Sequence, residues 1–151
     1  MKKCIIFLIV GLLLCSLNGC LSQTEKVYTY RQSADQIVSI EILRKEFDSD
    51  TITTPLYILK SFESSEFQMV LDGLANIPVS FRLNPPATGV GMYIIRITYK
   101  NGETDLIGDY NTGYMTADGE IFEERWFFKT EPYYDFISEL LGEEITDYTY
   151  G

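Results

Sequence analysis

The chain has 151 residues, a formal net charge of -10, three cysteines and no histidine. The lack of histidine excludes Ser-His-Asp and Cys-His mechanisms and nearly all zinc sites, because imidazole is their usual base or ligand. So acidic a chain is repelled by phosphate groups, and we therefore expect no nucleic-acid role.

The first twenty residues have the pattern of a cleaved export signal. Lys2 and Lys3 form a short positive region, and residues 5–17 form an apolar run broken only by Gly11 and Ser16. At about 1.5 Å per helical residue this run spans roughly 20 Å, which is short of the ~30 Å hydrocarbon core of a membrane. We therefore interpret it as a signal peptide rather than as a transmembrane helix.

The residues that close this segment, Leu17-Asn18-Gly19-Cys20, resemble the lipobox of bacterial lipoproteins. The resemblance implies cleavage between Gly19 and Cys20, and attachment of lipid chains such as palmitate through the Cys20 thiol. It implies a lipid-anchored protein on the outer side of the bacterial cytoplasmic membrane or in the outer membrane. The alternative is a secretory signal cleaved at the same site without lipid, which needs no cysteine directly after it.

Processing at this site would leave an acidic domain without a reactive thiol. All three cysteines, Cys4, Cys15 and Cys20, lie at or before the site, so we expect no disulfide, cysteine nucleophile or thiolate metal ligand. Loss of two lysines, Lys2 and Lys3, changes the formal charge from -10 to -12. Four parts are expected: the signal peptide 1–19, the lipidated cysteine and tether 20–36, a single domain 37–142, and an acidic tail 143–151.

Alternating apolar residues predict the strands. In residues 37–43, Val38, Ile40 and Ile42 share one face, and residues 56–62 form a second strand. The clearest alternation places four apolar side chains on one face of residues 92–99: Tyr93, Ile95, Ile97 and Tyr99.

Two glycine turns predict a three-stranded antiparallel meander at the C-terminal end. Asn101-Gly102 favours a tight hairpin with positive φ at both residues, and Asp118-Gly119 favours a second hairpin. The strands joined by these turns are expected at residues 92–99, 104–110 and 120–128, and an extension of the middle strand to Met115 is left open.

Two amphipathic helices complete the predicted fold. Ser64 or Ser65 is the expected N-cap of the first, where Ser65 and Gln68 fit a capping box. Thr130 caps the second helix, and Gly142 ends it. The apolar stripes contain Phe67, Val70, Leu71, Leu74 and Ile77 in the first helix and Tyr133, Phe136, Ile137, Leu140 and Leu141 in the second. We therefore predict an α+β domain, an antiparallel sheet with both helices packed on one face.

No metal ion or cofactor is predicted. The segment Asp109-Tyr110-Asn111-Thr112-Gly113, followed by Glu120, resembles a calcium loop only in part, because Tyr114 stands where such a loop needs glycine. Asp48 and Asp50 form another acidic pair, at a spacing that is common in solvated loops. We interpret both segments as connections.

Glu124 is a candidate site residue because alternation places it on the same face as Phe122, Trp126 and Phe128. A carboxylate among aromatic side chains has a raised pKa, which is typical of functional sites. We favour the structural alternative of an ion-paired strand, in which Arg96 faces Glu123 or Arg125.

Aromatic residues supply the other binding candidates. Tyr110, Tyr114 and Trp126, with Tyr133 and Tyr134, are able to line a sugar- or peptide-binding surface, since aromatic rings give contact area at little entropic cost. The alternative is that most of these rings belong to the core.

Three functions remain compatible with the sequence. The first is a membrane-anchored, non-catalytic module that binds an envelope protein or another envelope component, because the chain combines an anchor with one small domain and no catalytic motif. The second is a carboxylate-dependent envelope enzyme, such as a glycosidase that uses Glu124 or Asp109. The third is a small-ligand or inhibitor-type binder that uses the aromatic surface.

Overall fold

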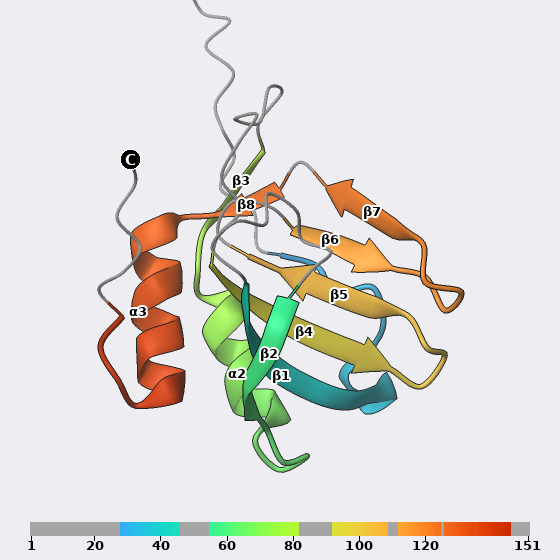
Figure 1. The fold of residues 1–151 in the computed structure, drawn as a ribbon, viewed down its shortest axis with the longest axis horizontal. Coiled ribbons are helices and arrows are strands. Elements are labelled where there is room, and N and C mark those ends of the chain that lie inside the picture. Colours follow the sequence, from blue (N-terminus) through green and yellow to red (C-terminus); the bar gives the residue numbers. More distant parts are fainter. Residues whose placement is uncertain (1–27, 46–54, 82–91, 109–111, 125, 146–151) are drawn as a thin grey trace, which may run out of the picture.

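The computed structural model describes residues 28–45, 55–81, 92–108, 112–124 and 126–145. Figure 1 shows these residues as one layer of sheet with two helices beside it. The elements in chain order are η1 (Ala34–Gln36), β1 (Ile37–Lys45), β2 (Pro55–Ser61), α2 (Phe67–Ala75), β3 (Val79–Phe81), β4 (Tyr93–Tyr99), β5 (Thr104–Ile107), β6 (Thr112–Met115), β7 (Ile121–Glu124), β8 (Trp126–Phe128) and α3 (Thr130–Leu141).

The sheet confirms the predicted α+β class. Six antiparallel strands lie in the order β2-β1-β4-β5-β6-β7, and β3 pairs with β8 in a separate two-stranded sheet. Both helices bury their apolar stripes in the core that covers one face of the larger sheet. This core includes Ile40, Ile42, Ile95 and Ile97 of the sheet, Val70 and Leu74 of α2, and Tyr133 and Ile137 of α3.

The C-terminal meander has four strands where the sequence predicts three. The expected middle strand, 104–110, contains β5, and the extension to Met115 that the sequence leaves open is a separate strand, β6, which pairs with β5. The expected third strand is two strands: β7, which ends at Glu124, pairs with β6, and β8, which begins at Trp126, pairs with β3. Strand β3, directly after Pro78, is not predicted, because three residues are too few to show an alternating pattern.

The turns confirm both hairpins and correct one detail. Gly102 and Gly119 adopt positive φ, but Asn101 does not. In each hairpin a backbone N–H donates across a three-residue loop, from Tyr99 to Glu103 (2.9 Å) and from Thr116 to Glu120 (2.8 Å). Such loops need one left-handed residue, which glycine supplies without strain.

The helix ends confirm one prediction and correct two. Gly142 ends α3 in the left-handed conformation, as expected. The helix α2 begins at Phe67 after Glu66, without a hydrogen bond from a capping side chain. Instead of a serine cap, the Glu66 carboxylate accepts the Glu63 N–H at 2.7 Å. Helix α3 begins at Thr130, so Lys129, not Thr130, holds the N-cap position.

The segments assigned to the tether and the tail also contribute to the packed unit. Tyr28 is buried in the main core, and the Tyr30 hydroxyl donates to the Leu71 carbonyl at 3.0 Å. After α3, the buried Ile145 donates its backbone N–H to the Ser138 hydroxyl at 3.1 Å. In the part of the chain that the structure describes, no helix is long and apolar enough to span a membrane.

A bulge in β1 corrects the predicted alternation. Ile37 lies opposite Tyr99, but Ser39 lies opposite Thr98, so that Val38 is an extra residue between the two pairs. Val38 is consequently 52% exposed, whereas Ile40 and Ile42 are fully buried. One extra residue moves a side chain out of the face that the period of two assigns to it.

We expect this bulge to separate two similar substitutions. Ile40→Ala should reduce the free energy of unfolding by about 2–5 kcal/mol, because it leaves a cavity in the core. Val38→Ala should change it by less than about 0.5 kcal/mol, since the removed methyl groups face solvent. Urea unfolding of both variants measures the difference, and equal losses would mean that Val38 is buried as the simple alternation predicts.

Candidate functional site

The sequence candidates lie on different elements. Tyr114 is in β6, and Trp126 is in β8, where it is half-buried and lies opposite Phe81. The backbone of Glu124 lies in β7 opposite Thr112. Tyr110 lies outside the described residues, as do Asp48, Asp50 and residues 109–111 of the calcium-like segment. Among the described residues, no group of three or more acidic side chains is arranged to hold a metal ion.

Tyr114 is the candidate that the structure joins to other exposed groups. Its ring stacks on that of Phe122, with centroids 4.9 Å apart and planes 16° apart. The Arg31 guanidinium carbon lies 3.5 Å from the Tyr114 ring centroid. We call these three residues the aromatic stack. Phe122 is 41% exposed, so the stack has a cation at one end and an open ring at the other.

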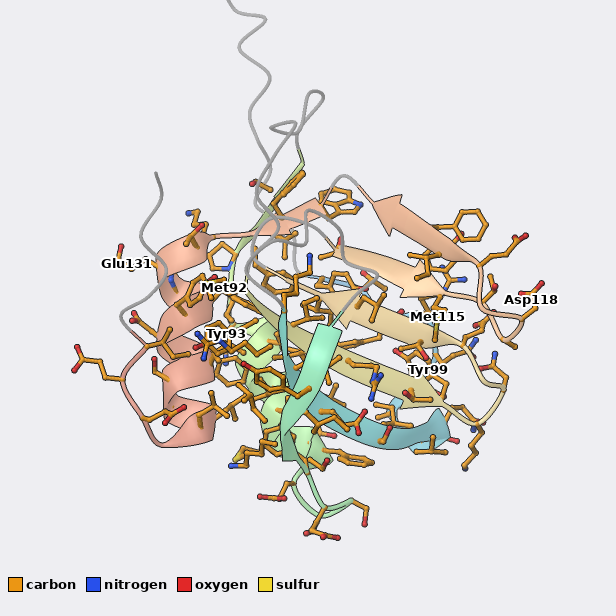
Figure 2. The ribbon with its side chains drawn as sticks, in the orientation of Figure 1. Met92, Tyr93, Tyr99, Met115, Asp118 and Glu131 are labelled. Carbon is orange, nitrogen blue, oxygen red and sulfur yellow. The ribbon has the colours of Figure 1, made fainter. Side chains whose placement is uncertain are left out.

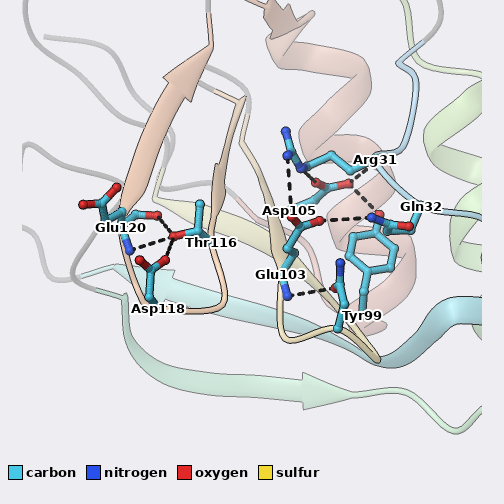
Figure 3. Close-up of polar contacts among 9 residues, drawn as sticks. Arg31, Gln32, Tyr99, Glu103, Asp105, Thr116, Asp118 and Glu120 are labelled. Atoms are coloured by element: carbon cyan, nitrogen blue, oxygen red, sulfur yellow. Dashed lines mark hydrogen bonds and ion pairs between the residues drawn. The ribbon is translucent and has the colours of Figure 1, made fainter.

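The buried carboxylate beside this stack belongs to Asp105, a residue that the sequence analysis did not select. Asp105 is fully buried and lies opposite Ile97 on one side and Tyr114 on the other. It accepts the Tyr99 hydroxyl at 2.6 Å and the Arg31 backbone N–H at 3.4 Å, and its other oxygen lies 4.0 Å from Arg31 Nε (Figure 3). The sequence contains one signal for this burial. Asp105 lies two residues before Ile107 in the same strand, so both side chains point to the same face of the sheet, and Ile107 is also fully buried.

A second carboxylate, Glu103, holds the same N-terminal segment. It accepts the Gln32 side-chain amide at 3.0 Å and lies 4.0 Å from the Arg31 guanidinium (Figure 3). Hydrogen bonds from the side chains of Asn101 and Gln32, with a smaller effect of the Arg31 charge, lower the pKa of Glu103. The two carboxylates therefore fasten residues 31 and 32 to β5 and to the residue directly before it, and this places Arg31 over Tyr114.

Two tyrosines keep their protons in this environment. Burial is the main cause that raises the pKa of Tyr99, followed by its hydrogen bond to Asp105 and the Asp105 charge. Burial and the charges of Asp105 and Asp72 raise the pKa of Tyr30 in the same direction. Both phenols consequently act as hydrogen-bond donors, and neither is suited to act as a base near neutral pH.

The expected partner of Arg96 is wrong. Arg96 pairs with Glu41 of β1, at 2.6 Å from Nη2 and 2.8 Å from Nε. Strand β4 lies between β1 and β5, so Arg96 cannot face Glu123, which belongs to β7 at the edge of the sheet. Arg125 lies outside the described residues. The single alternating face predicted for residues 120–128, with Glu124 beside Phe122, Trp126 and Phe128, does not exist either, because β7 and β8 belong to two different sheets.

The described acidic residues do not assemble a glycosidase-like pair around the stack. Asp105 is fully buried and engaged by Tyr99 and Arg31, so it has no surface with which to contact a substrate. A separate hollow of about 430 Å³ beside the end of α3 is lined by Asp135, Glu143 and Glu144, among others. These three acids are exposed, so the hollow lacks the apolar surroundings that a general-acid carboxyl needs.

A groove of about 490 Å³, lined by both polar and apolar residues, lies where α2 and α3 approach each other closely. Lys60, Met69, Gly73 and Phe136 are among its lining residues. A Cβ atom at Gly73 would lie 2.2 Å from the Phe136 ring, so the glycine permits this approach. Lys60 donates to the Leu140 carbonyl at 2.5 Å, so its ammonium group is already engaged at the groove.

Comparison with known proteins gives no match: no family model, no curated protein and no solved structure is detectably similar to this chain.

We expect the Tyr99 hydroxyl, which donates to Asp105, to contribute more to stability than a comparable buried hydroxyl. Tyr99→Phe should lower the free energy of unfolding by about 1.5–3 kcal/mol, the range for hydrogen bonds to a charged group. Tyr133→Phe is the matched control, because the Tyr133 hydroxyl is equally buried but donates to the neutral Ile107 carbonyl at 2.7 Å. Its expected cost is about 0.5–1.5 kcal/mol. The reverse order in chemical unfolding would show that Asp105 does not depend on this hydroxyl.

Acid should weaken the attachment of the N-terminal segment through Glu103. A carboxyl whose pKa is lowered on folding stabilises the fold above its unfolded value, here 4.5, and this stabilisation disappears as the pH falls through the folded value. Glu103→Gln should therefore reduce the loss of melting temperature between about pH 6 and about pH 3. Asn101→Ala, which removes the first hydrogen-bond donor, should act in the same direction. Identical pH profiles for wild type and Glu103→Gln would disprove this role.

Proposed function

We propose that this chain is a bacterial lipoprotein, anchored through Cys20, whose α+β domain is a non-catalytic binding module of the cell envelope. The observation that carries the anchor is the sequence Leu17-Asn18-Gly19-Cys20 after a short apolar signal. The observation that supports binding is an aromatic ring, Phe122, that is ordered by stacking on Tyr114 and still 41% exposed. Rigid, exposed aromatic side chains are typical of binding surfaces.

The attachment of the N-terminal segment determines where the binding surface would stand. Eight peptide steps separate Cys20 from Tyr28, where the described domain begins, and an extended chain of that length reaches at most about 28 Å. Arg31 follows three residues later and lies on the aromatic stack. The proposed surface therefore lies close to the point at which the tether joins the domain and within reach of other proteins at the same membrane.

Two other functions receive less support. A carboxylate-dependent enzyme needs two accessible acids across a cleft, whereas the buried acid of this region, Asp105, is engaged by Tyr99 and Arg31. A small-ligand binder remains compatible with the groove beside Met69 and Phe136. The exposed stack favours a macromolecular partner, because Phe122 lies on a strand at the rim of the sheet rather than inside a pocket.

We expect Cys20→Ser to release the protein from the membrane fraction of bacterial cells. The wild-type chain should incorporate an alkyne-labelled fatty acid, and the variant should not, because the acylated thiol is missing. Crosslinking in cells, followed by capture through a C-terminal tag, should then enrich an envelope protein with the anchored form alone.

Two further variants make this capture specific. Phe122→Ala should reduce crosslinking to the partner, whereas Met69→Ala, which removes an apolar side chain that is 51% exposed on α2, should not. A lipid-free wild-type protein, or membrane retention of Cys20→Ser, would disprove the anchor. Equal capture by the Phe122 and Met69 variants would remove the aromatic stack from the proposed binding surface.

A further inference from the structure

The open end of the aromatic stack lies on an edge strand. β7 is one edge strand of the six-stranded sheet, and β2 is the other. None of the described strands pairs with the outer side of β7 (Figure 1). Tyr114 and Phe122 lie directly opposite each other in the β6–β7 pair. The sequence of groups across the sheet is therefore Arg31, Tyr114, Phe122 and then an open position.

The backbone of β7 presents hydrogen-bonding groups at this position. The Thr116 N–H donates to the Glu120 carbonyl, which identifies residues 116 and 120 as a hydrogen-bonded pair. Such pairs alternate along an antiparallel ladder, so the pair Tyr114–Phe122 is hydrogen-bonded as well. The N–H and C=O groups of Ile121 and Glu123 consequently point away from β6, toward the open edge.

An added strand would place a side chain next to Phe122. A residue opposite Phe122 on such a strand would form a non-hydrogen-bonded pair, because its neighbours would exchange hydrogen bonds with Ile121 and Glu123. Facing side chains are closest in non-hydrogen-bonded pairs, with Cα atoms about 4.5 Å apart. The ring of Phe122 therefore offers both stacking and strand pairing at one place.

The other edge of the sheet is less suited to pairing. The register of β1 and β2 shifts between Ile42 and Leu43 and again between Arg44 and Lys45. Bulges of this kind twist an edge strand and disfavour a further partner. The β6–β7 register has no such shift.

The charge around β7 favours a basic partner. Asp118 and Glu120 are exposed in the turn that leads into β7, and Asp118 lies at the tip of that hairpin (Figure 2). The strand contains two glutamates among its four residues, Ile121 to Glu124, and the whole chain has a formal charge of -10. Pairing of β7 with a second copy would bring like charges together, whereas a basic strand would be attracted.

We propose that the outer edge of β7 binds an extended, basic segment of a partner protein, which adds a strand to the sheet and stacks an arginine on Phe122. The inner end of the stack shows the same contact within the chain, because the Arg31 guanidinium lies on Tyr114. This inference rests on the proposed binding function and names the class of partner for the same surface.

The probe for this proposal is a terminally blocked heptapeptide in which valine and arginine alternate. The full chain, purified from membranes in a mild detergent, should bind it, and the amides of residues 121 and 123 should become protected from hydrogen exchange. A heptapeptide that alternates valine with glutamate should bind at least about tenfold more weakly, because it meets the acidic edge. High salt should weaken binding of the arginine heptapeptide, because it screens the attraction between opposite charges.

Four variants separate stacking from pairing. Phe122→Ala should weaken binding of the arginine heptapeptide about threefold to tenfold, and Phe122→Tyr should restore it. Glu123→Pro should weaken binding as well, because it removes an outward N–H without removing a bond to β6. Met69→Ala is the control and should bind as the wild type does. Melting temperatures identify any variant that fails to fold, and the two heptapeptides then decide the proposal on the wild-type chain.

Three results would overturn the proposal. These are equal binding of the two heptapeptides, protection of β2 instead of residues 121 and 123, and self-association of the chain through β7. The proposed function as an anchored binding module would still hold after each of these results if a partner were captured from cells with the wild-type chain but not with Cys20→Ser. Loss of that partner together with intact heptapeptide binding would instead remove the envelope role and leave the docking edge in place.

Discussion

The position of a single buried carboxylate determines how the N-terminal segment meets the sheet. Asp105 occupies an inward-facing place in β5, next to Ile97, where an apolar residue would suit the core. A charge in such a place is costly unless it is hydrogen-bonded and paired, and Tyr99 and Arg31 meet both needs. The segment before β1 is therefore part of the fold, because without it Asp105 would keep the Tyr99 hydrogen bond but lose both of its contacts with Arg31. The same requirement fixes Arg31 where its guanidinium covers Tyr114.

One face of the sheet has two parts, one covered by the helices and the other covered by Arg31. Over β1 and β4, isoleucines pack against α2 and α3. Toward β5, β6 and β7, the same face carries Asp105, Tyr114 and Phe122, and the described residues supply Arg31 as a cover in place of a helix. A guanidinium suits this task because it pairs with carboxylates at its edge and stacks on a ring with its face. The face thus changes from apolar packing to a polar and aromatic surface toward the rim of the sheet.

Local signals predicted the parts of the fold that depend on local physics. The alternation of Tyr93, Ile95, Ile97 and Tyr99, the glycine turns and the Gly142 stop are all present. The bulge at Val38 escaped prediction because an extra residue is fixed by its partner strand, and no partner can be read from one strand alone. The separation of β7 from β8 escaped prediction for the same reason, since β8 is defined by its pairing with β3. In the candidate site, the sequence indicates Tyr114 but neither Asp105 nor Arg31, because the contact between Asp105 and Arg31 joins positions 74 residues apart.

The attachment of residues 31 and 32 to Asp105 and Glu103 would have a mechanical consequence for an anchored molecule. Tension between a membrane at Cys20 and a partner held at β7 would enter the domain at Tyr28 and reach the sheet through Asp105 and Glu103. From β5 the load would cross β6 to β7 by strand pairing, in the direction of the interstrand hydrogen bonds. Helix α2 would share this load through the Tyr30 hydroxyl, which donates to the Leu71 carbonyl. That hydrogen bond, the carboxylate contacts and three neighbouring strands would determine how much pull the module withstands.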